Sequence, residues 1–164
     1  MLVVDRYNAY NKAPVQIQYC YAHLLRDVEK LEKDFPDSPE IKSFVSILAP
    51  LLSQAMHLRS QPLSDEQYYR EAKEIQKRIM EAIQSPAQHL AVRAIQDLFH
   101  TNEHQLYHRV RDRRDPPDNN LAERNLRPTV IARKVSFGSS SDVGSKTRSV
   151  MMSLLHTLNK RRRD

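Results

Sequence analysis

The stretch VQIQYCYAHLLRDVEKL, residues 15–31, contains the change of pattern that decides the fold. In residues 15–21 apolar side chains alternate with Gln16, Gln18 and Cys20, which is the two-residue period of a strand. From Ala22 onward the apolar positions recur at three and four residues, which is the period of a helix. The chain is therefore predicted to leave a small sheet and continue as helices.

Upstream of this stretch lies a second short strand candidate. The run from Met1 to Val4 is apolar and ends in Asp5, as expected for a buried strand that reaches the edge of a sheet. We therefore expect a strand remnant at the start of the chain.

Downstream, three serines mark expected helix starts. Ser38 precedes a proline at the first helical position, whereas Ser64 and Ser85 each have a glutamine three residues later, the pattern of a capping box. Pro50 predicts a kink or break in the helix that follows Ser38. The middle of the chain is predicted to be a set of amphipathic helices.

The last third combines a loop with two further helices. Residues 109–120 are polar and contain two adjacent prolines, which predicts a loop. Residues 121–127 can form a short helix that ends before Pro128, and the turn at 138–142 can cap a helix that begins near Val143.

Composition excludes several classes of protein. The chain has 164 residues, 40% hydrophobic and 28% charged, a globular balance for one domain or one domain with an insertion. Two glycines are too few for Gly-rich phosphate loops. A single cysteine and the lack of a signal-peptide pattern fit a reducing cytoplasm. The apolar run 45–52 is short and interrupted, so we expect no membrane span.

The net charge of +6 is unevenly distributed. Residues 1–108 carry 12 Lys and Arg against 14 Asp and Glu, whereas residues 109–164 carry 14 against 6. A basic C-terminal third suggests a polyanionic partner, either nucleic acid or a membrane surface. A solubilising basic end is an equally open interpretation.

One motif in this basic part changes the argument. In PDNNLAERNLRP, residues 117–128, a loop rich in Asn and Asp leads into a helix that carries Glu123 among Arg124 and Arg127. The segment resembles the signature of the insertion sequence 66 family of bacterial transposases, where a DNN–AER–RP motif contains the Glu of the catalytic Asp-Asp-Glu triad. The resemblance continues through Arg133-Lys134 into the closing helix.

The other end of the chain agrees with this resemblance. VVDRYNAY, residues 3–10, is similar to the family's strand with the second catalytic Asp, which places that role on Asp5. CYAH, residues 20–23, is similar to the family's C-x-x-H segment. Both motifs occur in the family's order, which makes the resemblance stronger than either motif alone.

The resemblance implies a mainly α (α+β) fold, a partial ribonuclease-H-like catalytic domain with a helical insertion and a small strand remnant. Residues 1–22 would be the strand remnant, 23–108 the insertion, and 109–164 the part with the catalytic Glu and the basic surface. The implied process is DNA transposition in the bacterial cytoplasm, at the nucleoid. The expected partners are the element's ends and the target DNA, with a second copy or full-length transposase also open, and no membrane.

The implied chemistry is metal-dependent phosphodiester cleavage and strand transfer. Asp5 and Glu123 would be the catalytic ligands of Mg²⁺ or Mn²⁺, since hard cations prefer carboxylate oxygens. From the residues alone, another interpretation remains open: Asp5 caps a turn, and Glu123 pairs with Arg127 on its own helix. The candidate phosphate contacts are the basic residues around the motif: Arg124, Arg127, Arg133 and Lys134.

One departure from the family pattern bears on activity. The family's first catalytic Asp lies on an earlier strand, and none of the four residues before Asp5 is acidic. We therefore expect the C-terminal part of a transposase, truncated at its N-terminus, with little activity of its own. A non-catalytic DNA-binding or regulatory fragment is the alternative, and an inert helical remnant is a third possibility.

Two other groups of residues have competing interpretations. Cys20 and His23 could bind zinc, but one cysteine is few for such a site, so a buried Cys20 is favoured. Histidines also recur on one expected helical face, at 100, 104 and 108. Four tyrosines could stack on unpaired bases, although packing is favoured for them: Tyr7, Tyr10, Tyr19 and Tyr21.

Overall fold

The computed structural model describes residues 1–136, 138 and 141–162, with the backbone alone for Asn8 and Asn11. The chain forms two compact units, which we call unit 1 (Met1–Asn119) and unit 2 (Asn120–Asp164). The predicted functional segments, 1–22, 23–108 and 109–164, divide the chain differently and stay a prediction.

Unit 1 begins with a two-stranded parallel sheet. Strand β1 (Leu2–Val4) pairs with β2 (Ile17–Tyr19) so that Val4 lies opposite Tyr19, and the 3₁₀ helix η1 (Asn8–Lys12) lies between them in the chain. Both predicted strands are present but shorter. All three residues of β2 are buried, so the predicted polar face is wrong, because this strand is covered on both sides as in parallel sheets.

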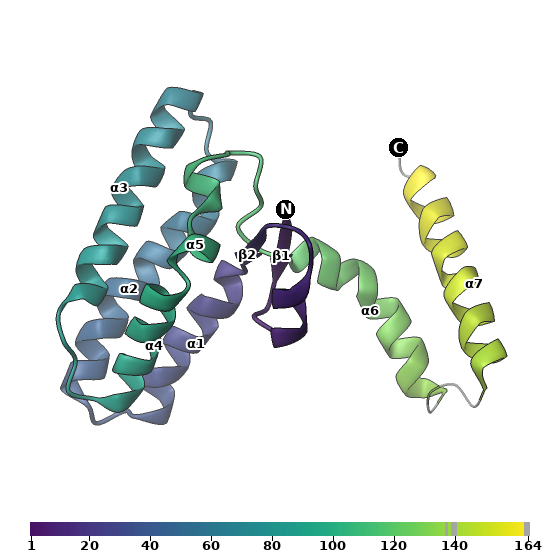
Figure 1. The fold of residues 1–164 in the computed structure, drawn as a ribbon, viewed down its shortest axis with the longest axis horizontal. Helices are drawn as coiled ribbons and strands as arrows, with labels where there is room; N and C mark the ends of the chain where they lie inside the picture. Colours follow the sequence, from purple (N-terminus) through teal and green to yellow (C-terminus); the bar gives the residue numbers. More distant parts are fainter. Residues whose placement is uncertain (137, 139–140, 163–164) are drawn as a thin grey trace. The chain divides into compact units, whose positions relative to one another are not determined.

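Helices make up the rest of unit 1 (Figure 1). Helix α2 packs against both α1 and α3, and α4 packs against α3. Their apolar stripes form one continuous core with Val4 and β2. The elements are α1 (Tyr21–Asp34), α2 (Pro39–His57), η2 (Leu58–Ser60), α3 (Asp65–Gln84), α4 (Leu90–Thr101), α5 (Glu103–Leu106) and η3 (His108–Val110). A mainly helical fold with a small sheet is therefore confirmed.

Two of the three predicted helix starts are confirmed. The Ser38 hydroxyl accepts a hydrogen bond from the Ile41 N–H at 3.4 Å, at the start of α2. Ser64 and Gln67 form the predicted reciprocal capping box of α3, with bonds of 3.2 and 2.9 Å. Local sequence therefore determines both helix starts.

The start predicted at Ser85 is wrong, because α4 begins at Leu90 with His89 as its N-cap. A tertiary contact explains the difference. The Glu40 carboxylate, in the first turn of α2, accepts hydrogen bonds from the Gln88 N–H at 2.7 Å and the His89 N–H at 3.0 Å. These bonds keep the segment before Leu90 out of the helix.

The predicted break at Pro50 is also wrong, since α2 is continuous from Pro39 to His57. Pro50 and Ser46 are both exposed, so the Ser46 carbonyl that loses its helical partner lies on the solvent side. Residues Pro39–Ser60 are long and apolar enough to span a membrane by length and composition, which the short run 45–52 did not suggest. The buried apolar side chains of α2 belong to the core of unit 1, and a core helix meets the same criterion.

Unit 2 consists of α6 (Asn120–Val135) and α7 (Asp142–Arg161). The predicted end before Pro128 is wrong, because α6 continues through this exposed proline. The Ser141 hydroxyl accepts a hydrogen bond from the Gly144 N–H at 3.1 Å and caps α7, as predicted for this turn. No described residue of either helix is buried.

Candidate DNA and metal site at the carboxyl edge of the sheet

Asp5 lies directly after β1, at the carboxyl edge of the parallel sheet. Its side chain is exposed, and Oδ1 accepts a hydrogen bond from the Tyr7 N–H at 3.3 Å. Arg6 has a φ of 71°, a left-handed conformation that is uncommon for a residue other than glycine. An ion pair from Arg6 to Asp27 of α1 holds this turn, and with it the position of Asp5.

Cys20 occupies the corresponding place at the end of β2. Its N–H donates to the Val4 carbonyl at 2.8 Å, so it lies beside the end of β1. The side chain is buried, as predicted, and this burial raises the pKa of the thiol.

The start of the PDNN segment reaches the same edge of the sheet. The Pro117 carbonyl accepts a hydrogen bond from the Tyr21 N–H at 2.9 Å. A backbone hydrogen bond from Asn119 lowers the pKa of Cys20, and the charge of Asp118 raises it, both against the larger effect of burial. The structure therefore brings together the C-x-x-H segment and the first residues of the motif that contains Glu123.

A buried set of polar side chains holds the segment that leads to this contact. We call Gln18, Tyr21, Tyr68 and Arg109 the polar seam. Gln18 is fully buried; its Nε2 donates to the Leu106 carbonyl at 3.0 Å, and its Oε1 accepts from the His108 N–H at 3.1 Å. The Tyr21 hydroxyl donates to the same Leu106 carbonyl at 2.6 Å. These bonds tie residues 106–108 to β2 and α1.

Arg109 completes the polar seam. Its side chain is 1% exposed, and its guanidinium donates to the Ala55 carbonyl of α2 and lies 4.2 Å from the centre of the Tyr21 ring. The Tyr68 hydroxyl donates to the Arg109 carbonyl at 3.2 Å. The sequence placed this arginine in a polar loop, and nothing in its neighbours signalled a buried cation that lies over an aromatic ring.

The four candidate tyrosines divide into two pairs. Tyr19 and Tyr21 are buried, so packing is confirmed for them. Tyr7 is 66% exposed and Tyr10 41%, and their rings meet edge to face with centres 5.9 Å apart. Only the second pair, which follows Asp5 in the chain, is available to stack on a base.

The histidines predicted to share a helical face do not share one helix. Helix α4 ends at Thr101, α5 begins at Glu103, and His108 lies in η3. The backbone N–H and the side-chain amide of Asn102 both donate to the Leu98 carbonyl, at 3.1 and 2.8 Å, and so end α4. Among the described residues no group of three His, Cys, Asp or Glu side chains could hold a metal ion.

The remaining candidates lie on α6 in unit 2, and all are exposed. Glu123, Arg127 and Lys134 share one face of this helix, and Arg124 and Arg133 flank it on either side. One carboxylate among basic side chains suits a metal-bound phosphate. Asp5 belongs to unit 1 and Glu123 to unit 2, so their approach to one another stays a prediction.

Comparison with known proteins gives one result. Residues 1–147 match the family model described as Transposase IS66 family. No curated protein and no solved structure matches the chain.

Proposed function

This chain belongs to the IS66 family of transposases, and we propose that it carries part of the active site that cleaves and joins DNA during transposition. In this proposal Asp5 and Glu123 are the catalytic carboxylates. The proposed place of action is the bacterial cytoplasm, at the nucleoid.

The observation that carries this proposal is the meeting of the two motifs at the edge of the sheet. Asp5 follows β1, Cys20 follows β2, and the Pro117 carbonyl accepts the Tyr21 N–H at that edge. Glu123 is four residues beyond Asn119, so the chain limits the separation of their Cα atoms to about 14 Å. Connectivity thus supports a shared site for Asp5 and Glu123.

The donor chemistry fits a hard divalent cation. Asp5 and Glu123 offer carboxylate oxygens on exposed side chains, the ligands that Mg²⁺ and Mn²⁺ prefer. When bound, such an ion lowers the pKa of the attacking hydroxyl and stabilises the leaving oxygen of a phosphodiester. Arg127 and Lys134, on the face of α6 with Glu123, would neutralise the phosphates beside the reacting one.

A third carboxylate is needed for the complete triad. The family resemblance assigns it to a strand that comes before β1, and none of residues 1–4 is acidic. In the described residues β1 pairs with β2 alone, so the other edge of β1 has no strand partner there. We propose a ribonuclease-H-like sheet completed by that strand, which would supply the missing carboxylate.

Cleavage of a supercoiled plasmid that carries the element's ends tests this function. A chain extended by an upstream strand with the missing Asp should nick the plasmid with Mg²⁺, and the 164-residue chain should show little or no activity. Asp5→Asn and Glu123→Gln should each abolish nicking but preserve DNA binding, because they remove a metal-binding charge with little change of shape. Glu74→Gln, an exposed glutamate of α3, is the matched control and should retain full activity.

Two results would contradict the proposal. Full activity of Glu123→Gln would exclude this residue as a ligand, and robust turnover by the 164-residue chain would mean that another acid replaces the missing one. Salt-sensitive DNA binding without nicking by the extended chain would favour the alternative, a DNA-binding or regulatory protein.

DNA binding by α6 has its own test. Each phosphate contact contributes about 0.9 to the slope of log K against log salt concentration. Replacing Arg124, Arg127 and Arg133 with Ala should therefore flatten this slope by about 2 to 3. An unchanged slope would assign the basic residues of α6 to solubility.

A further inference from the structure

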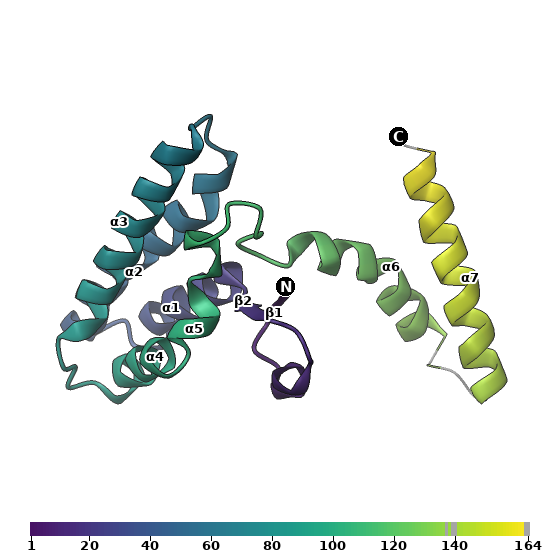
Figure 2. The same cartoon turned by 45° about the horizontal axis from the view of Figure 1, so that its top comes forward.

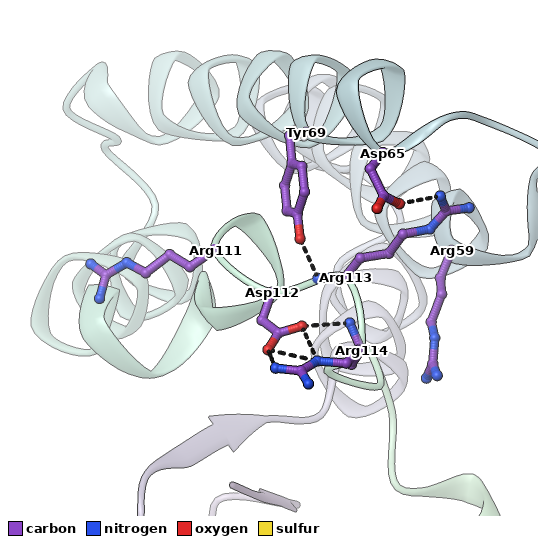
Figure 3. Close-up of a pocket in the computed structure, with 7 residues that line it drawn as sticks. All are labelled: Arg59, Asp65, Tyr69, Arg111, Asp112, Arg113 and Arg114. Carbon is purple, nitrogen blue, oxygen red and sulfur yellow. Dashed lines mark hydrogen bonds and ion pairs between the residues drawn. The ribbon is translucent and has the colours of Figure 1, made fainter.

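The segment after α2 meets the segment after η3 at one end of the helical bundle of unit 1 (Figure 2). A second basic surface lies there (Figure 3). It is a pocket of about 550 Å³, which we call the arginine pocket. Four arginines line it together with Tyr69 and two aspartates: Arg59, Arg111, Arg113 and Arg114. None of these four was a candidate site residue in the sequence.

Arg113 lines the arginine pocket and is held in place by several contacts. Its guanidinium donates to the Leu63 carbonyl at 2.7 Å and to Asp65 Oδ1 at 2.9 Å, and lies 5.0 Å from the centre of the Tyr68 ring. Its backbone N–H donates to the Tyr69 hydroxyl at 3.2 Å. The charge of Arg113 is therefore neutralised by Asp65, and the Tyr69 hydroxyl keeps its own proton to donate.

The second aspartate, Asp112, is also paired with an arginine. Asp112 accepts hydrogen bonds from the backbone and guanidinium of Arg114 at 2.6 to 3.1 Å. These bonds lower the pKa of Asp112 to about 2, so it stays ionised and paired. Each carboxylate of the arginine pocket thus offsets one arginine.

Arg59 and Arg111 supply the charge that remains. Both side chains are exposed, and neither has a hydrogen bond or ion pair within the described part of the chain. Their guanidinium groups point to opposite sides of the pocket, with Arg114 between them in the view of Figure 3. Diverging charges cannot enclose one small anion, but they suit an anion that repeats along a chain.

We propose that the arginine pocket binds the phosphodiester backbone of DNA through Arg59 and Arg111, as a surface additional to the basic residues of α6. This proposal rests on the proposed DNA-binding function. The two arginines would contact separate phosphates, and the Tyr69 hydroxyl would donate to a phosphate oxygen between them. Contacts of this kind position DNA without reading its sequence.

The test uses the full chain and a fluorescently labelled DNA duplex, with affinity measured by anisotropy over a range of salt concentrations. The double variant Arg59→Ala/Arg111→Ala should lower the salt slope by about 2, at about 0.9 for each lost phosphate contact. The loss should be similar for unrelated duplex sequences, because backbone contacts carry no sequence information.

The matched control is Lys42→Ala/Arg78→Ala. It also removes two exposed charges from unit 1, near the start of α2 and near the end of α3, at the opposite end of the bundle. Its salt slope should equal that of the unchanged chain. Since all four side chains are exposed, both double variants should retain the melting temperature of the parent.

The outcomes separate this proposal from the function on which it rests. If the parent chain shows salt-dependent binding and both double variants keep its slope, the arginine pocket is not a DNA surface, while the proposed function stands. If the parent chain does not bind DNA, both fail. Displacement of DNA by inorganic phosphate beyond a chloride control of equal ionic strength, lost in Arg59→Ala/Arg111→Ala, would overturn the backbone proposal in favour of a single-anion site.

Discussion

Units 1 and 2 are built from the same kind of amphipathic helix but differ in what those helices bury. Leu48 of α2 is 0% exposed, whereas Leu154 of α7 is 54% exposed. In unit 1 the apolar stripes of four helices meet in a single core. In unit 2 the stripe of α7 remains exposed; it consists of Val150, Met151, Leu154, Leu155 and Leu158.

This difference shows that a helix-forming sequence and a buried stripe are separate properties. Capping serines start helices in both units, at Ser64 and at Ser141. Packing against neighbouring elements supplies most of the stability of helices in proteins, and isolated helices are marginal in water. We therefore expect unit 1 to unfold cooperatively and α7 to unfold separately, at lower denaturant concentration.

The largest expected effect comes from the same substitution made in each unit. Leu48→Ala should lower the free energy of unfolding of unit 1 by about 2 to 5 kcal/mol, because it leaves a cavity in the core. Leu154→Ala should change it by less than about 0.5 kcal/mol. All seven tyrosines lie in unit 1, so tyrosine fluorescence during urea unfolding reports on this unit alone. Equal losses for the two variants would mean that α7 is buried in solution.

The polar seam gives the next effect. Gln18→Leu should destabilise unit 1 by about 1 to 3 kcal/mol, since it leaves the part-buried His108 N–H and the buried Leu106 carbonyl without the Gln18 amide as partner. Gln16 is exposed and lies two residues before Gln18, so Gln16→Leu should leave the free energy of unfolding nearly unchanged. Hydrogen exchange at the Tyr21 N–H should also be faster in Gln18→Leu, because the segment that ends at Pro117 loses its attachment to β2. An unchanged exchange rate at the Tyr21 N–H would mean that the polar seam does not hold the candidate site in place.

A smaller effect is expected at the helix starts. Ser64→Ala should lower the free energy of unfolding of unit 1 by about 1 kcal/mol, since it removes the hydroxyl that accepts the Gln67 N–H at the start of α3. Ser141→Ala removes an equivalent cap but should leave the unfolding of unit 1 unchanged and reduce only the helical signal in far-ultraviolet circular dichroism. A shift of the tyrosine transition by Ser141→Ala would contradict the independence of the units.

The smallest effect concerns Asp112 in the arginine pocket. Its bonds with Arg114 lower its pKa to about 2, below the ordinary value of 3.8. A depressed pKa stabilises the folded state above the unfolded pKa, so this contribution is present above about pH 4 and is lost as the pH falls toward 2. A carboxyl-carbon NMR titration should give a pKa near 2, and Arg114→Ala should return it to the ordinary range. An ordinary pKa for Asp112 in the unchanged chain would contradict its pairing with Arg114.

The helix positions could largely be predicted from the sequence, because periodicity and caps act locally. The caps at Ser38 and Ser64 are examples. Two of the failures have nonlocal causes: Glu40, distant in sequence, moves the start of α4 to Leu90, and burial on both faces places Gln18 inside. No local pattern announces such contacts.

The candidate site divides in the same way. The family resemblance made Asp5 and the PDNN segment candidates, and the hydrogen bond between Tyr21 and Pro117 lies at the sheet edge where β1 ends before Asp5. Arg109 and the arginine pocket could not be predicted, because their roles depend on which of several neighbouring arginines faces the core. Arg109 is buried and Arg111 is exposed, although only one residue separates them.

The proposal that Asp5 and Glu123 share a metal site is tested most directly by Mn²⁺ added in small amounts to the ¹⁵N-labelled chain. The paramagnetic ion broadens the amide signals of residues close to it, which requires no catalytic activity. We predict broadening around both Asp5 and Glu123 at the same Mn²⁺ concentration, its loss from both regions in Asp5→Asn and in Glu123→Gln, and no change in Glu74→Gln. Broadening around one of the two residues alone, or its persistence around Glu123 in Asp5→Asn, would contradict the shared site.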